Sequence, residues 1–271
     1  MKKLITAAMA LALATGLASA QVESANIVGY QGHATVGGKF NMPAVQFQVP
    51  GGASIAINDL FADTTMLTQG GGVVDADNIR VWNPVTSGYA YYFLYNDESG
   101  YNPEWDGKWL DSSNPMAGPT TATLAPGTPF WLLRQGGADT NLTTAGEVPS
   151  AAEFPFNITK GKFNMIANPY PTDLALNGTN FVIDAAQAVQ GGGVVDADNI
   201  RVWNPVTSGY AYYFLYNDES GYNPEWDGKW LDSSNPMAGP TASGMPAGAG
   251  AWYLSQPATA TDWTLTIKKP Y

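Results

Sequence analysis

Residues 69–120 decide the fold of this chain. They read QGGGVVDADNIRVWNPVTSGYAYYFLYNDESGYNPEWDGKWLDSSNPMAGPT and return without a single change as residues 190–241. The identity extends through turns such as residues 96–100, which core packing would allow to vary. A recent duplication explains this identity better than shared chemistry does. The chain is therefore built from two copies of one unit.

The duplication extends beyond the identical block. Residues 38–42 (GKFNM) return as residues 161–165, and residues 131–133 (WLL) return as residues 252–254 (WYL). We therefore predict two domains, with copy 1 covering residues 21–146 and copy 2 covering residues 147–271. Each copy lies near the commonest domain size, about 100–150 residues, and can enclose a core.

Composition and turn signals predict an all-β fold, with two tandem antiparallel β-sandwich or barrel-like domains. Charged residues make up 13 % of the chain, against about 25 % in an ordinary globular protein, and the chain has 30 Gly, 14 Tyr and 9 Trp. Residues 79–82 and 89–95 predict paired strands, and residues 130–133 predict a further strand. Asp106 and Gly107 predict a type I′ hairpin turn between Trp105 and Trp109. Short helices are predicted only within residues 57–67 and 184–189.

The N-terminus predicts export. Lys2 and Lys3 precede an apolar run over residues 4–17, and residues 18–20 (ASA) have the small side chains read by signal peptidase. We predict a signal peptide over residues 1–20, a mature chain that begins at Gln21 without a transmembrane segment, and a secreted or cell-surface location. The mature chain has 10 basic and 23 acidic residues, a net charge of −13, which disfavours nucleic acid as a partner. The chain has no cysteine, so its stability relies on burial or on a bound metal rather than on disulfides.

Several motifs resemble those of a known family. They are residues 26–30 (NIVGY), 79–83 (IRVWN), 146–149 (GEVP), 163–169 (FNMIANP) and the Pro126-Gly127 turn before residues 130–131 (FW). Together they resemble an uncharacterised family of secreted tandem β-repeat proteins of Verrucomicrobia-type bacteria. The resemblance implies export and a β-domain, and it assigns no site. Copy 1 departs from the pattern at residues 43–46 (PAVQ), where copy 2 has residues 166–169 (IANP).

The identical block is rich in aromatic side chains beside carboxylates and amides, a mixture that suits sugars. A pyranose presents an apolar face that stacks on Trp or Tyr, and its hydroxyls pair with Asp, Glu and Asn. The same aromatic residues also build β-cores, and we expect Trp82 and Trp131, inside apolar strands, to be core. Trp105 and Trp109 flank a polar turn and are the best candidates for exposure. The candidate ligand-binding residues are Tyr101, Glu104, Trp105, Asp106 and Trp109, with Tyr222, Glu225, Trp226, Asp227 and Trp230 in copy 2.

Calcium is the one candidate metal. Three oxygen-bearing side chains stand within four residues at Asp75, Asp77 and Asn78, and again at Asp196, Asp198 and Asn199. Their spacing does not match an EF-hand. The alternative is that these side chains accept local backbone hydrogen bonds before a strand.

Catalytic residues are scarce. His33 is the single histidine and lies outside the block, which argues against a Ser-His-Asp triad. Glu98 and Glu104 are the least implausible glycosidase pair, but both lie in polar turns. We therefore predict a non-enzymatic repeat protein of the cell surface or extracellular matrix that contacts a surface protein or self-associates. A carbohydrate-binding protein with one aromatic site per repeat is the alternative, and a glycoside hydrolase or an outer-membrane barrel is less favoured.

Overall fold

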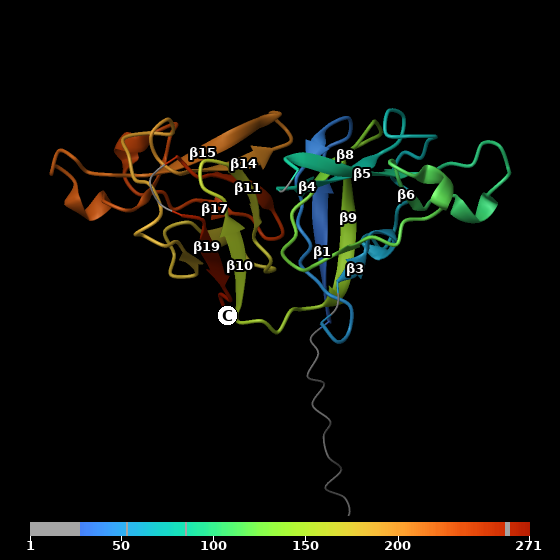
Figure 1. The fold of residues 1–271 in the computed structure, drawn as a ribbon, viewed down its shortest axis with the longest axis horizontal. Coiled ribbons are helices and arrows are strands. Elements are labelled where there is room, and N and C mark those ends of the chain that lie inside the picture. The colour runs from blue at the N-terminus through green and yellow to red at the C-terminus, as the bar shows by residue number, and fades with distance from the viewer. Residues whose placement is uncertain (1–27, 53, 85, 258–260) are drawn as a thin grey trace, which may run out of the picture.

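The computed structural model describes residues 28–271, except for positions 53, 85 and 258–260 (Figure 1). The predicted signal peptide, residues 1–20, and the predicted mature N-terminus at Gln21 lie outside the described residues. Among the residues that are described, the regular elements are β-strands and short 3₁₀ helices. The strands of the sheets pair antiparallel, from β1 with β9 to β5 with β6. The prediction of an all-β, antiparallel fold is confirmed.

Copy 1 contains a five-stranded sheet and two separate strand pairs. The order in the five-stranded sheet is β2-β8-β4-β5-β6. Its strands are β2 (Phe40–Asn41), β8 (Trp131–Leu133), β4 (Asn78–Asn83), β5 (Gly88–Leu94) and β6 (Trp109–Asp111). The pairs are β1 (Val28–Thr35) with β9 (Thr140–Glu147) and β3 (Ile55–Ala56) with β7 (Thr123–Leu124).

Copy 2 repeats this arrangement with one added strand. The order in its five-stranded sheet is β11-β18-β14-β15-β16, and a three-stranded sheet has the order β10-β19-β13. The larger sheet consists of β11 (Phe163–Ala167), β18 (Gly250–Leu254), β14 (Asn199–Asn204), β15 (Gly209–Leu215) and β16 (Trp230–Asp232). The others are β10 (Glu153–Ile158), β19 (Trp263–Lys268), β13 (Phe181–Val182), β12 (Leu174–Ala175) and β17 (Gly244–Met245).

The period of two in β4 and β5 gives each five-stranded sheet two different faces. Ile79, Tyr92 and Leu94 point into the core of copy 1. Their neighbours Trp82 and Tyr89 lie on the opposite face, because successive strand residues alternate in direction. The two strands pair as predicted around residues 83–88, with Trp82 opposite Tyr89. The identical sequence gives β14 and β15 the same burial pattern.

The predicted helices are shorter than expected. Residues 57–67 contain only the 3₁₀ helix η1 (Ile57–Asp59), and residues 184–189 form a turn. The carboxylate of Asp63 accepts the N–H of Thr65, and that of Asp184 accepts the N–H of Ala186. Each of these bonds spans two residues and closes a local turn, which the chain does not continue into an α-helix. The other 3₁₀ helices are η2 (Pro103–Trp105), η3 (Pro115–Ala117), η4 (Pro224–Trp226) and η5 (Pro236–Ala238).

The predicted type I′ hairpin at Asp106 and Gly107 is wrong. Asp106 has φ −55° and ψ 132°, and Gly107 has φ 68°, the signature of a type II turn, in which only the second central residue needs positive φ. The N–H of Lys108 closes the turn on the carbonyl of Trp105 at 3.0 Å. The turn follows η2 rather than a strand, so Trp105 and Trp109 do not face each other across a hairpin.

Each copy encloses its own buried core, and one asparagine outside the identical block anchors the block to it. Asn58 accepts the N–H of Trp109 at 2.8 Å and donates to the carbonyl of Thr120 at 2.9 Å. Asn177 makes the same two bonds to Trp230 and Thr241. Both copies therefore fasten β6 or β16 through one amide side chain, which satisfies backbone groups that the sheet edge leaves open.

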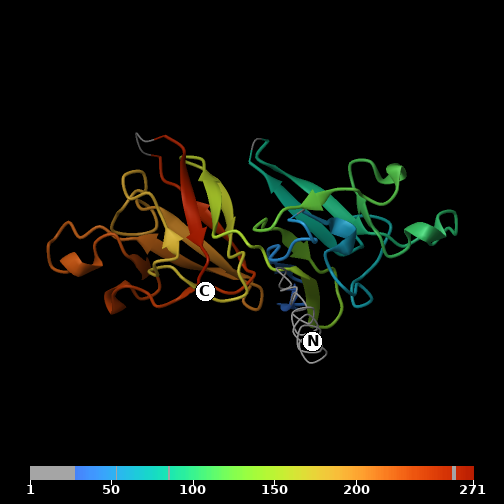
Figure 2. The same cartoon turned by 90° about the horizontal axis from the view of Figure 1, so that it is seen from below.

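The two copies lie side by side along the long axis of the molecule (Figures 1 and 2). The five-stranded sheets approach each other in the middle. The loops around β6, and the equivalent loops of copy 2, lie at opposite ends. The middle and the two ends are therefore the places where a duplicated function would be presented.

Candidate ligand-binding cleft

Four tryptophans join the two copies in reciprocal pairs. Trp82 packs edge-on against Trp252, with ring centroids 5.5 Å apart, and Trp131 packs against Trp203 at 5.4 Å. Both pairs have an interplanar angle of 84°. Trp203 is the copy of Trp82, and Trp252 is the copy of Trp131, so the same contact is made twice. This reciprocity is the property of a two-fold interface.

Residues 43–46, where the sequence of copy 1 differs from that of copy 2, form hydrogen bonds between the two copies. The N–H of Ala44 donates to the carbonyl of Gly248, and the N–H of Gly250 donates to the carbonyl of Met42, both at 2.8 Å. The side chain of Gln46 donates to the carbonyl of Tyr170 at 2.8 Å. The departure at residues 43–46 therefore serves the attachment of copy 2 to copy 1.

Two cavities of about 290 and 240 Å³ open beside the tryptophan pairs, and we call them together the central cleft. One is lined by Trp82, Tyr89, Phe163, Arg201, Tyr210 and Trp252. The other is lined by Phe40, Arg80, Tyr89, Trp131, Trp203 and Tyr210. Tyr89 and Tyr210 are copies of each other and line both cavities, and the other members exchange under the duplication. The cleft is thus a composite site, because each half takes side chains from both copies.

The aromatic rings of the central cleft keep part of their surface accessible. Trp82, Tyr89, Trp203 and Tyr210 are all half-buried. Tyr89 packs edge-on against Trp82 at 5.0 Å, and Tyr210 packs against Trp203 at 4.9 Å. Burial is the main cause that raises the pKa of both tyrosine hydroxyls. The rings are therefore held by packing while their remaining faces line an open cavity. The expectation that Trp82 would be core is wrong, whereas Trp131 is buried.

The two halves of the cleft differ at one atom. The indole N–H of Trp203 donates to the carbonyl of Phe40 at 2.7 Å. The equivalent Nε1 of Trp82 is buried and has no hydrogen-bond partner among the described residues. The two-fold relation of the copies is therefore approximate, and the half around Trp82 holds an unsatisfied donor.

One arginine stands in each half of the cleft. Arg80 donates from Nε to the side-chain oxygen of Asn78 at 2.8 Å, and its guanidinium lies 4.7 Å from the ring centre of Phe40 and 5.3 Å from that of Tyr91. Arg201 makes the same contacts with Asn199, Phe163 and Tyr212 at 3.0, 4.7 and 5.3 Å. These contacts are cation–π interactions and fix the plane of each guanidinium.

The sequence-predicted ligand residues lie elsewhere, at the two ends of the molecule, and one pair of them is not exposed. Trp109 is 1 % exposed and Trp230 is 2 % exposed, so their expected exposure is wrong. Strand alternation explains the error, because Trp109 begins β6 with its ring toward the core of copy 1. Trp105 is half-buried against Tyr95 at 6.3 Å. Trp226 repeats this contact with Tyr216 at 6.4 Å.

The polar candidates at the ends shape a loop. Asp106 accepts the N–H of Asp97, whose own carboxylate accepts the hydroxyl of Ser99 at 2.6 Å and the N–H of Asn102 at 2.7 Å. These bonds lower the pKa of Asp97. Glu104 and Tyr101 are exposed. Copy 2 has the same arrangement, with Asp227 accepting the N–H of Asp218 and with Glu225 and Tyr222 exposed.

The calcium candidates use their oxygens on the protein itself. Asp75 accepts the N–H groups of Gly71 and Gly72 at 3.0 and 2.9 Å, and Asp196 repeats this in copy 2. Asn78 and Asn199 accept the arginine Nε of the central cleft. The residues that the structure describes contain no group of three or more His, Asp or Glu placed to hold a metal ion. Asp75 and Asp196 thus make the local backbone hydrogen bonds of the alternative, and calcium binding at these residues stays a prediction.

The remaining pair of calcium candidates, Asp77 and Asp198, is fully buried and has different partners in the two copies. Asp77 forms an ion pair with Nε of Arg134 at 2.7 Å. Asp198 instead accepts the hydroxyl of Tyr253 at 2.8 Å. Both carboxylates also accept the N–H of the equivalent glutamine, Gln135 at 2.6 Å and Gln256 at 2.7 Å. Burial raises the pKa of Asp198, and the bonds from Gln256 and Tyr253 act in the opposite direction.

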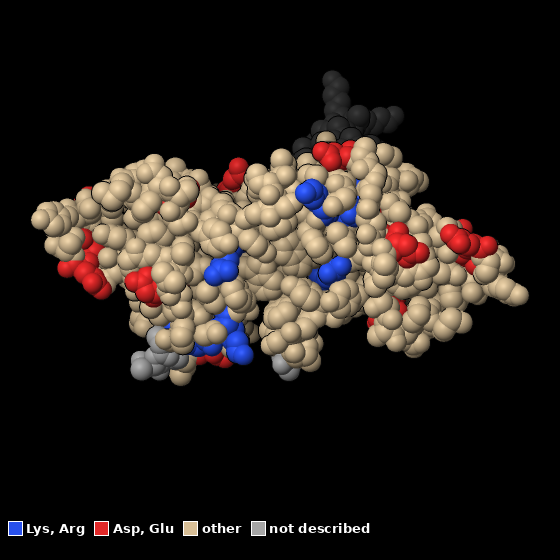
Figure 3. Space-filling model, turned by 90° about the horizontal axis from the view of Figure 1, so that it is seen from above, with Lys and Arg blue, Asp and Glu red and all other residues tan. Residues whose placement is uncertain are grey.

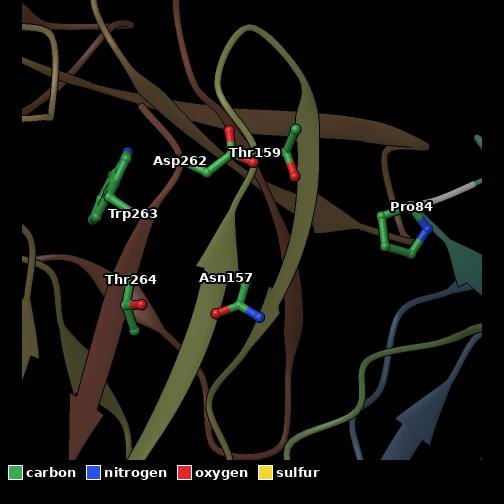
Figure 4. A pocket seen from close by; sticks show the side chains of 6 residues that line it. All are labelled: Pro84, Asn157, Thr159, Asp262, Trp263 and Thr264. Atoms are coloured by element: carbon green, nitrogen blue, oxygen red, sulfur yellow. The ribbon is translucent and has the colours of Figure 1, made fainter. Parts of the chain in front are cut away.

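A larger, more polar groove of about 590 Å³ lies beside the cleft (Figure 4). Asn157 comes from β10, Trp263 and Thr264 come from β19, and Pro84 comes from the β4–β5 loop of copy 1. Thr159 and Asp262 complete its lining. Trp263 is 6 % exposed and belongs to the core of copy 2. The groove therefore offers little accessible surface of aromatic side chains. The central cleft is the better site for a ligand that stacks on such rings.

His33 lies at the edge of another cavity, beside the junction of the copies. The cavity measures about 240 Å³ and is also lined by Trp203, Pro205 and residues 246–249. The ring of His33 is 8 % exposed and contacts the hydroxyl of Thr144 at 3.1 Å. Burial lowers its pKa from 6.5 to about 4. At neutral pH it is therefore an uncharged, packed side chain.

Sequence reasoning missed the central cleft, although a signal for it was present. Arg80, Trp82, Tyr89 and Tyr91 share one face of two paired strands by their period of two. This spacing predicts an arginine beside aromatic rings on the face opposite the core, where cation–π contacts form. The missing information was that the other copy covers part of this face.

Comparison with protein families, curated proteins and solved structures gives no match. The resemblance to secreted tandem β-repeat proteins therefore stays a prediction. Over the described part of the chain, no helix has the length and apolar character needed to cross a membrane. The central cleft, with paired aromatic and arginine side chains from both copies, is the arrangement on which a function can be argued.

Proposed function

We propose that this protein is a non-enzymatic, exported binding protein that takes carbohydrate in its central cleft. The observation that carries the proposal is the pair of cavities, each built from half-buried Trp and Tyr rings of both copies. Accessible faces of Trp and Tyr suit the apolar face of a sugar ring. This proposal keeps the carbohydrate alternative and moves its site from the ends of the molecule to the middle.

The cavity sizes fit this ligand class. At about 290 and 240 Å³, each cavity lies near the lower end of the range for small-molecule sites, roughly 300 Å³. Each half therefore suits a small ring, and the two halves are adjacent because Tyr89 and Tyr210 line both. A chain of linked rings fits such a pair better than one large rigid molecule does.

The test is a glycan array probed with the mature chain, residues 21–271, followed by titration of the best ligand. Tyr89→Ala and Tyr210→Ala should each weaken binding by roughly fivefold to tenfold, because each removes a stacking ring worth about 1 kcal/mol. Tyr101→Ala and Tyr222→Ala are matched controls, since these tyrosines are 85 % and 86 % exposed and do not line the cleft. Binding that depends on Tyr101 and Tyr222 but not on Tyr89 would contradict the proposal.

A second candidate function is contact with a surface protein through the two ends. Tyr101 and Met116 are 85 % and 80 % exposed, and Tyr222 and Met237 repeat them in copy 2. Exposed apolar side chains presented twice would suit a bivalent contact. This candidate predicts that Tyr101→Ala with Tyr222→Ala abolishes attachment to cells and leaves glycan binding unchanged.

A further inference from the structure

The arginines of the central cleft are held in place but not neutralised. The Nε side of each guanidinium is bound by Asn78 or Asn199, and its faces lie against aromatic rings. Among the described residues, the terminal N–H groups of Arg80 and Arg201 make no hydrogen bond. The ion pair that the described residues contain joins Arg134 to Asp77, and neither cleft arginine takes part in it.

A half-buried cation without a counter-ion is unfavourable, because burial removes solvation and nothing replaces it. Burial is the main cause that lowers the pKa of Arg80, and no carboxylate opposes that effect. Both arginines line cavities rather than open surface. An anionic group that enters the cleft would therefore meet the terminal N–H donors of a guanidinium, which have no partner among the described residues.

The distribution of charge favours an anion at this place. The mature chain is strongly acidic, yet Lys and Arg gather over the middle of the face seen from above (Figure 3). Asp and Glu lie at both ends of this face and at the upper and lower edges of its middle. Lys39 and Lys162, which directly precede β2 and β11, are also exposed. Basic side chains gathered over the middle of the face favour the approach of negative groups there over the acidic ends.

We propose that the central cleft binds an acidic polysaccharide, with sugar carboxylates on Arg80 and Arg201 and sugar rings against Tyr89 and Tyr210. This inference rests on the proposed carbohydrate function and adds the chemical class. A planar carboxylate matches the two parallel N–H donors of a guanidinium, so it fits better than a point charge does. The shared chemistry is an anionic sugar substituent, and uronate carboxylate is the form to which the fork geometry points.

The ligand arm of the test uses the unaltered mature chain. Polygalacturonate, its fully methyl-esterified form and dextran sulfate are titrated by calorimetry in low salt. We expect polygalacturonate to bind at least tenfold more tightly than the ester, which has the same sugar backbone without the charge. Equal binding of the ester would overturn the carboxylate assignment and leave the carbohydrate function standing. Binding of dextran sulfate alone would also overturn it, in favour of sulfate esters.

The protein arm uses matched variants. Arg80→Gln and Arg201→Gln should each weaken polygalacturonate binding about tenfold, and the double variant should weaken it about a hundredfold. Lys108→Gln with Lys229→Gln removes the same charge from exposed positions outside the cleft and should change binding less than threefold. Circular dichroism checks that each variant is folded. Unchanged binding in the double arginine variant would overturn the inference, and failure of every glycan, neutral or acidic, would overturn the proposed function itself.

Discussion

Asp77 and Asp198 occupy the same position in two identical stretches of sequence, yet the two copies stabilise them differently. In copy 1, Arg134 donates to Asp77, to the hydroxyl of Thr35 at 2.9 Å and to the carbonyl of Met66 at 2.9 Å. Copy 2 has Ser255 in place of Arg134, and the hydroxyl of Tyr253 binds Asp198 instead. One buried carboxylate thus has a charged partner in copy 1 and a neutral one in copy 2.

The two copies also use a cation from different parts of the sequence to bind one backbone carbonyl. In copy 1, Arg134 donates to the carbonyl of Met66. The carbonyl of Gln187, which corresponds to that of Met66, accepts Lys160 in copy 2. Copy 1 has Gly37 at the position of Lys160. The positive charge therefore comes from Arg134, near the end of the copy, in copy 1, and from Lys160, near the start of the copy, in copy 2. The identical block therefore keeps one structure while the residues around it satisfy the same buried groups by different means. Identity of sequence does not imply identity of energetics.

The largest expected effect is a difference in unfolding free energy between variants of Asp77 and of Asp198. Asp77→Asn leaves the guanidinium of Arg134, which is 1 % exposed, without its counter-ion and should cost about 3–5 kcal/mol of unfolding free energy. Asp198→Asn should cost about 1 kcal/mol, because its carboxylate pairs with neutral donors and an amide oxygen can still accept one of them. Urea denaturation of the wild type and both variants measures the difference. Equal losses would show that the ion pair adds nothing over the neutral arrangement.

His33 provides a pH test of the same comparison, since copy 2 has Phe156 at its position. The folded pKa is about 4 and the ordinary value is 6.5, so the unfolded chain binds the proton first on acidification. Stability should therefore fall as the pH drops from about 6.5 to about 4, by roughly 3 kcal/mol, and this contribution should level off below that range.

His33→Gln is the control, because glutamine has no proton to gain in this range. The pH dependence that the wild type shows in excess of the variant should be the histidine contribution, measured by urea denaturation between pH 4 and 7. Parallel pH profiles for the two proteins would contradict the burial of a neutral imidazole.

A smaller effect than those of Asp77 and His33 is expected at Tyr253, the neutral partner of Asp198 in copy 2. Tyr253→Phe removes the hydroxyl that binds Asp198 and should cost about 1–2 kcal/mol at neutral pH. That bond lowers the pKa of Asp198, so its loss raises the pKa further. A carboxyl with a raised folded pKa favours folding at low pH and loses that contribution as the pH rises through the folded value. The cost of Tyr253→Phe should therefore shrink on acidification.

Tyr213→Phe is the matched control for that variant. Tyr213 is also buried in the core of copy 2, and its hydroxyl makes no hydrogen bond to a described residue. Its removal should change stability by less than about 1 kcal/mol and without the same pH dependence. A pH-dependent loss as large as that of Tyr253→Phe would assign the effect to general core packing.

Much of the fold could be predicted from local sequence, because strand pairing within a copy depends on nearby residues. The β4–β5 pairing follows from the alternation of residues 79–82 and 89–95, and β8 follows from residues 130–133. The central cleft could not be predicted, because it depends on contacts between the two copies, such as that of Trp82 with Trp252. The sequence pattern within one copy does not show how the two copies pack together. Exposure of Trp109 was predicted from its neighbouring polar turn, whereas the direction of its strand decided its burial.

The reciprocal tryptophan pairs have a consequence for assembly. An aromatic surface that fits a copy of itself cannot distinguish the partner on its own chain from the same partner on another molecule. Intramolecular closure is favoured by the short connection between β9, which ends at Glu147, and β10, which begins at Glu153. Such a tether holds the second copy at an effective concentration on the order of millimolar. Lengthening that connection lowers this advantage, so chains would begin to exchange halves and form swapped dimers at lower protein concentration.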